Sequence, residues 1–180
     1  MRTWFNNLKA LARRKLADSG LRGTIDGRTE LLVEHIRGGK VIGKRVVLDK
    51  VITTAFVNDI VAAMRGLAAH GTFDDYKFHG SGTGTGAEAV GDPNLGTPVQ
   101  DTDSNYRVTG TQEEGDNPNI YKSVATITYG GNHAITEHGL FNNVTNAAGV
   151  LMDRTKFDPV NVVDGDSIQF TYTGQFNAGG

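Results

Sequence analysis

Two histidines and a glutamate lie close together in the sequence and have the residue types of a metal site. They are His133, Glu137 and His138. An inverted zinc-protease motif has two residues between its first histidine and the glutamate, on a helix, so that both imidazoles reach one metal. Here three residues intervene, and the surrounding pattern is typical of a strand, whose side chains alternate between faces. His138 would then face away from the other two, so we expect polar sheet residues and no metal ligands.

A run of alternating glycines at residues 80–86 has the composition of a phosphate-binding loop. Such a loop needs a lysine and a serine or threonine after its last glycine, whereas Ala87 and Glu88 follow here. The dinucleotide fingerprint needs glycines at relative positions one, three and six, and the sixth position is not glycine when counting starts at residue 80 or 82. We therefore expect no cofactor. The segment 80–105 is instead expected to lie on the surface or to clamp a neighbouring subunit.

No spacing in the sequence indicates a catalytic group. The chain has no cysteine and no Gly-x-Ser-x-Gly elbow around a nucleophilic serine. Glu113 and Glu114 are adjacent carboxylates, but the Gly-Asp-Asn-Pro stretch at 115–118 is typical of an exposed turn. We expect an acidic loop there. The chain is not expected to be an enzyme, and no catalytic residue is assigned.

The elements that would position these residues are mainly strands. With 24 glycines among 180 residues and a net charge of only −2, the composition indicates many tight turns rather than disorder. Near the C-terminus, Ile168, Phe170, Tyr172 and Phe176 alternate with polar residues, as in an antiparallel strand with one face on the core. Further strands are predicted at 121–129, 135–141 and 150–157, with turns at 142–149 and 164–165. We predict a mainly β protein with an antiparallel, jelly-roll-like β-sandwich.

One hairpin is predicted ahead of these strands. Its apolar runs lie within residues 31–47 and flank Gly38 and Gly39, which can both take positive φ in a two-residue turn. We assign the hairpin, together with a basic helical arm, to an N-terminal part at residues 1–50. Residues 51–180 are assigned to the β-sandwich domain with its leading helix.

This leading helix has a clear 3.6-residue period. Thr53 or Thr54 can cap its start, and Gly71 can end it. The apolar positions are Phe56, Val57, Ile60, Val61, Met64 and Leu67. We expect the helix to pack against the sheet or against a partner subunit.

The first residues are predicted to form a basic amphipathic helix. Residues 2–17 place Trp4, Leu8 and Leu11 on one face, and the first 18 residues include five basic and one acidic residue, a net charge of +4. Charges interrupt the apolar residues, unlike in a secretory signal. The helix could pack on its own domain or dock on a neighbouring subunit. We expect neither a membrane nor nucleic acid as partner. The partner-binding candidates are Trp4, Phe5, Leu8, Arg13 and Arg14.

Three pieces of the chain, in this order, resemble a recurrent module of tailed-bacteriophage virion structural proteins. The first is Y-K-F-H-G-S-G-T-G at 76–84, followed by D-P-N-L-G-T at 92–97. The second is I-T-E-H-G-L-F-N at 135–142. The third is L-M-D-R-T-K-F-D-P-V at 151–160, with G-D-S-I-Q-F-T-Y-T at 165–173. The resemblance covers about residues 54–176, and the first 50 residues have no counterpart in the module.

This resemblance implies a structural part of the virus particle. We expect a capsid decoration (cement) protein that binds at capsid subunit junctions and stabilises the shell. The alternative is a tail, baseplate or fibre component for assembly or host-surface binding, with tyrosines 106, 121, 129 and 172 as aromatic platforms. The implied partners are the major capsid protein or other virion proteins, in a homo-oligomer that we expect to be a trimer. The implied location is the virion, assembled in the cytoplasm of the host bacterium.

Ordinary structural roles are predicted for the motif residues. Glycines 80, 82, 84 and 139 suit tight backbone turns, and Phe141, Phe157 and Phe170 suit core positions. Glu137 and Arg154 lie in strands predicted to be neighbours, so we expect a cross-strand ion pair.

Overall fold

The computed structural model describes residues 25–48, 51–65, 75–101, 107–146 and 148–178. The chain divides into a large unit of residues 28–175 and a small unit of residues 1–27 with 176–180. The fold below is that of the large unit. None of the helices in the described ranges has the length and apolar character that a membrane span requires.

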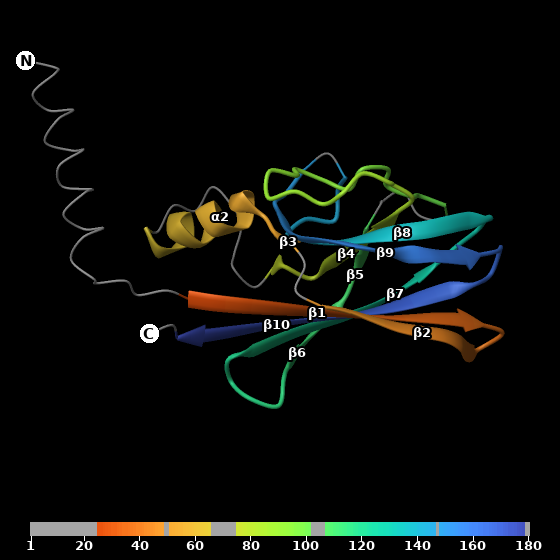
Figure 1. The fold of residues 1–180 in the computed structure, drawn as a ribbon, viewed down its shortest axis with the longest axis horizontal. Coiled ribbons are helices and arrows are strands. Elements are labelled where there is room, and N and C mark those ends of the chain that lie inside the picture. Colours follow the sequence, from red (N-terminus) through yellow and green to blue (C-terminus); the bar gives the residue numbers. More distant parts are fainter. Residues whose placement is uncertain (1–24, 49–50, 66–74, 102–106, 147, 179–180) are drawn as a thin grey trace, which may run out of the picture. The chain divides into compact units, whose positions relative to one another are not determined.

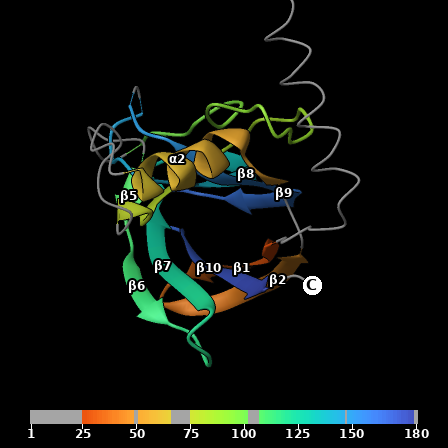
Figure 2. The same cartoon turned by 90° about the vertical axis from the view of Figure 1, so that its left-hand side faces the viewer.

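Two antiparallel five-stranded sheets form a β-sandwich, as predicted (Figures 1 and 2). The first sheet, sheet A, has the order β2 (Lys40–Leu48), β1 (Ile25–Arg37), β10 (Ser167–Ala178), β7 (Ile120–Thr128) and β6 (Thr111–Glu114). The second, sheet B, has the order β3 (Val51–Ile52), β9 (Leu151–Val162), β8 (His133–Phe141), β4 (Phe78–Gly82) and β5 (Arg107–Thr109). Figure 2 shows the two sheets as separate layers.

The alternation predicted near the C-terminus builds the core face of sheet A. Ile168, Phe170 and Tyr172 on β10 are fully buried, while the residues between them are partly exposed. Their partners on β7 include Ala125 and Ser123, which are also buried. Period-two alternation was sufficient to predict β10 because one face of sheet A packs on the core and the other is open to solvent.

The predicted hairpin is present, with Gly38 at φ 56° and Gly39 at φ 73°. Its strands β1 and β2 lie in sheet A, where β1 is the neighbour of β10. The structure therefore differs from the assigned division after residue 50, which would cut this hairpin from the sandwich. A strand that supplies Leu31 and Val33 to the core cannot be an appendage.

The predicted helix is α2 (Thr54–Met64), and Thr53 caps it by accepting a hydrogen bond from the Phe56 amide at 3.2 Å. It contacts β9 and lies on the side of sheet B away from sheet A. Only Phe56 and Asp59 are buried, through a perpendicular ring contact and a 2.6 Å hydrogen bond with Tyr76. The helix thus packs against the sheet, the first of the two predicted alternatives, but with only part of its apolar stripe, since Val57, Val61 and Met64 are exposed.

Candidate functional site

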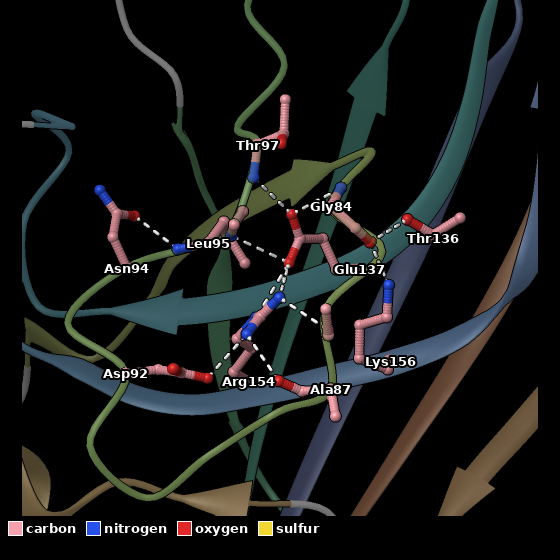
Figure 3. A network of polar contacts seen from close by, with 12 residues as sticks. Gly84, Ala87, Asp92, Asn94, Leu95, Thr97, Thr136, Glu137, Arg154 and Lys156 are labelled. Carbon is pink, nitrogen blue, oxygen red and sulfur yellow. Dashed lines mark hydrogen bonds and ion pairs between the residues drawn. The ribbon is translucent and has the colours of Figure 1, made fainter.

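A buried ion pair lies on the face of sheet B that is turned away from sheet A (Figure 3). Glu137 on β8 is fully buried, and its Oε2 accepts hydrogen bonds from Arg154 Nε at 2.9 Å and Nη2 at 2.7 Å. Arg154 on β9 is directly opposite Gly139, so the pair is diagonal across the two strands. The predicted cross-strand ion pair is confirmed.

Backbone amides of the glycine-rich segment complete the shell of the Glu137 carboxylate. Oε1 accepts from the Gly84 and Thr97 amides, each at 2.9 Å, and Oε2 accepts from the Gly96 amide at 3.1 Å. Burial acts to raise the pKa of Glu137, but these amides and Arg154 outweigh it and lower the pKa. The carboxylate is therefore ionised and saturated, which leaves no lone pair to act as a general base.

The same segment is held from its other side by cations and a hydroxyl. Arg154 Nη1 bonds Asp92 Oδ2 at 2.7 Å, and its Nη groups also reach the Gly86 and Ala87 carbonyls at 3.3 Å. Lys156 Nζ and Thr136 Oγ1 both donate to one more carbonyl of the segment, that of residue 84. The segment lies on the surface, as predicted, since residues 85–101 are exposed or partly exposed apart from the buried Leu95. These contacts clamp it onto its own sheet.

The glycines of the motif provide space, and the prediction that they form tight turns is wrong. Gly80 and Gly82 lie in β4, and Gly139 lies in β8. A Cβ atom on Gly84 or Gly82 would lie 2.3 or 2.5 Å from Glu137 Oε1, and one on Gly139 would lie 2.8 Å from the ring of a phenylalanine. The glycines with positive φ among the described residues are Gly38, Gly39, Gly149 and Gly165.

An apolar cluster supports the clamped segment beside the ion pair. Leu95, from the segment, is buried against Phe141 and Leu151, with Phe78 at the edge of the cluster. Phe141 thus occupies a core position as predicted, and so does Phe170 between the sheets, whereas Phe157 is only partly buried.

Between the two sheets lies a second polar group, which the sequence analysis missed. His79 Nδ1 is 2.9 Å from His138 Nε2, and His79 Nε2 is 2.8 Å from Ser123 Oγ. The three residues come from β4, β8 and β7, so no sequence spacing connects them. The order serine, histidine, histidine is that of a nucleophile, a base and an orienting group.

Burial prevents this trio from acting as a catalytic triad. All three side chains are fully excluded from solvent, and the His138 ring packs on Phe170 at 4.7 Å. Burial lowers the pKa of His79 to about 3, and burial together with the neighbouring His79 lowers the pKa of His138. Both rings are neutral, and no substrate can reach Ser123, so the trio is part of the core.

The three residues of the candidate metal motif have separate partners. His133, the first residue of β8, bonds Asp101 at 2.8 Å, Glu137 pairs with Arg154, and His138 pairs with His79. Across the described part of the chain, no three or more histidine, aspartate or glutamate side chains are placed to share a metal ion.

The third motif piece has a further buried carboxylate at the turn between β9 and β10. Asp166 accepts from Arg37 Nε at 2.7 Å and Nη2 at 2.6 Å, and it lies 2.9 Å from His35 Nε2. The Arg37 guanidinium holds the pKa of Asp166 well below its ordinary range. This motif residue therefore joins the β9–β10 turn to the end of β1.

Comparison with models of protein families, with curated proteins and with solved structures found no match to this chain.

The partner-binding candidates Trp4, Phe5, Leu8, Arg13 and Arg14 lie outside the described residues. The prediction of an acidic loop at Glu113 and Glu114 is wrong, because both are exposed residues at the end of strand β6, where Glu113 forms an ion pair with Lys122 at 2.8 Å, and the turn begins only after them.

Proposed function

We propose that this chain is a structural protein of a tailed-phage virion, a decoration (cement) protein that binds at capsid subunit junctions. One observation supports this most directly. Residues of all three motif pieces that carry the phage resemblance meet in one network, with Gly84 from the first, Glu137 from the second and Arg154 from the third (Figure 3). The motif residues thus hold the glycine-rich segment on the outer face of sheet B.

Such a network suits a protein whose task is to keep its shape. Glu137 and Arg154 at its centre are buried, and they use their hydrogen-bonding capacity on one another, on Asp92 and on the backbone. A rigid body of this kind can repeat the same weak contacts at many equivalent positions of a shell, where symmetry multiplies their effect. The proposed partners are the major capsid protein or other virion proteins, and the proposed assembly is a homotrimer.

The tail or fibre alternative loses part of its rationale in the described residues. It relied on tyrosine platforms for glycans, but Tyr129 and Tyr172 are buried in the sandwich. Tyr106 lies outside the described residues.

The copy number in purified virions tests the proposal. Particles of the phage whose genome encodes this chain would be purified, and the chain quantified against the major capsid protein by mass spectrometry with isotope-labelled peptides. We expect roughly hundreds of copies, since a cement protein occupies every equivalent junction. A copy number of three to roughly a few tens, as at a single tail with low-order symmetry, would move the protein to the tail. Absence from the particle would reject both assignments.

A further inference from the structure

The two edges of sheet B are protected against pairing with another chain. Its end strands β3 and β5 are two and three residues long. Beyond β3, the open side of β9 contains Pro159, and Arg45 donates to the carbonyls of Asp158 and Pro159. Short strands, proline and a capping cation are the usual protections of a sheet edge.

Strand β2, at one edge of sheet A, has neither a short length nor a proline, and its protection is limited to the charged side chains of Lys40, Lys44 and Arg45. It is nine residues long and contains no proline. Val41, Ile42, Val46 and Leu48 are each more than half exposed, and they are four of the nine large exposed hydrophobic residues in the described ranges. An extended apolar edge of this kind is the usual template for pairing with another strand.

Strand β6, at the other edge of the same sheet, has the opposite charge. Figure 2 shows β6 and β2 at the two sides of this layer. All four residues of β6 are exposed, and they include Glu113 and Glu114 but no basic residue. Strand β2 has Lys40, Lys44 and Arg45 but no acidic residue. The two edges of sheet A are therefore electrostatically complementary to one another.

The strand directions decide how two copies would meet. In an antiparallel sheet of five strands, the first and the fifth run the same way. A second copy that continues the sheet by rotation about an axis along the strands keeps this direction, so its β2 lies parallel to β6 of the first copy. A two-residue acidic sequence then meets a two-residue basic sequence, with Glu113 beside Lys44. Glu114 lies beside Arg45, whose guanidinium also donates to the Asp158 and Pro159 carbonyls of its own copy.

The side-chain faces agree with this register. Glu113 is opposite Lys122, and Lys44 is opposite Glu34, so both lie on the solvent face of sheet A. Glu114 and Arg45 both lie on its other face, since Arg45 is opposite the buried Val33. No side chain has to cross the sheet to find its partner.

We propose that copies of this chain associate head to tail through sheet A, with β6 of one copy pairing in parallel with β2 of the next. The contact covers the apolar side chains of β2 and places opposite charges together. Because each copy uses two different edges, the contact is heterologous and closes into a ring when the rotation allows. The inference uses only the edges of this sheet and stands whether or not the chain belongs to a virion.

Engineered cysteines test the register directly, because the natural chain has none. In the proposed register Thr111 is beside Ile42, and neighbouring parallel strands lie about 4.8 Å apart, within reach of a disulfide. We expect the variant Thr111→Cys with Ile42→Cys to form covalent oligomers on mild oxidation, seen on non-reducing gels. The matched control is Thr126→Cys with Ile42→Cys, since Thr126 is exposed on β7 but not at an edge. Equal cross-linking in both variants, or none in either, would overturn the proposal.

Charge exchange tests the same contact without covalent trapping. We expect Glu113→Lys and Lys44→Glu each to weaken self-association by at least about tenfold in sedimentation experiments. Each replaces an exposed intramolecular ion pair with a pair of like charges, which at these exposed sites costs only about 1 kcal/mol or less of stability. The double variant Glu113→Lys with Lys44→Glu should recover association, because the altered β6 edge of each copy matches the altered β2 edge of the next. A monomeric natural chain at all concentrations, or a double variant that does not recover, would contradict the pairing.

Discussion

Two neighbouring residues on β8 illustrate opposite ways to bury a titratable side chain. Glu137 and His138 are both fully buried, on opposite faces of sheet B. Glu137 remains charged because five N–H donors reach its carboxylate. His138 is neutral, and its Nδ1 has no hydrogen-bond partner in the described part of the chain.

The difference arises from what covers each face. A loop lies over Glu137, and its amides are available because they are not used in a strand ladder. The face around His138 is covered by another sheet, whose amides are already paired, so only side chains such as those of His79 and Ser123 can reach it. The charge of Glu137 is thus met by irregular backbone that covers its face, whereas His138, between the two packed sheets, is met by the neutral side chain of His79.

Removing the Arg154 cation that pairs with Glu137 should have the largest effect on the stability of the fold. Arg154→Met leaves the Glu137 carboxylate buried without its counter-charge, and we expect a loss of about 3–5 kcal/mol in the free energy of unfolding. Urea denaturation followed by circular dichroism would measure this.

A double variant tests the electrostatic origin of that loss. Adding Glu137→Gln to Arg154→Met removes the orphaned charge but keeps an acceptor for the loop amides. We expect the double variant to be more stable than Arg154→Met alone. If it is less stable, lost packing explains the effect better than buried charge does.

Acid should destabilise the protein through the neutral histidine pair, His79 and His138. The pKa of His79 is about 3 in the folded state and close to 6.5 in the unfolded state, so protons bind preferentially to the unfolded chain. The contribution of the neutral histidines to the free energy of unfolding is therefore fully present above pH 6.5. This contribution falls as the pH drops toward 3, with a slope of up to about 1.4 kcal/mol per pH unit for each histidine.

Unfolding measured between about pH 6 and pH 5, where few carboxylates titrate, isolates this effect. The double variant His79→Gln with His138→Leu removes both titrating rings and retains a partner for Ser123. We expect its stability to change less with pH than that of the natural chain. Equal slopes would show that the pair does not control acid sensitivity.

A methyl group added at Gly84 should have a smaller effect on stability than the changes at Arg154 and at the histidine pair. Gly84→Ala places a Cβ 2.3 Å from Glu137 Oε1, and we expect a cost of about 1–3 kcal/mol from overpacking. Gly86→Ala is the control, because no atom lies within 4 Å of the Cβ position there. Thermal unfolding should separate the two variants. Similar melting temperatures would mean that the contacts between the glycine-rich segment and Glu137 can shift to admit the methyl group at little energetic cost.

Several features of the fold were predictable from short-range patterns. Alternation predicted β10, and the Gly38-Gly39 pair predicted the turn, because each depends on residues that are adjacent in the sequence. The Glu137–Arg154 pair was also accessible, since only 17 residues separate two strands that are consecutive along the chain.

The sequence alone thus determined the longer strands β1, β2, β7, β8, β9 and β10, the turns between them and the order of the motif pieces. The tertiary structure decided the short strands β3, β5 and β6 and what the motif residues do. The contact of Glu137 with Gly84 spans 53 residues, and that of His138 with His79 spans 59. Local periodicity does not report such distances, so the glycines were taken for turn residues and the histidine pair was missed. The physical reason is that burial and counter-charge depend on which distant segment covers a face, and only the packed chain specifies that segment.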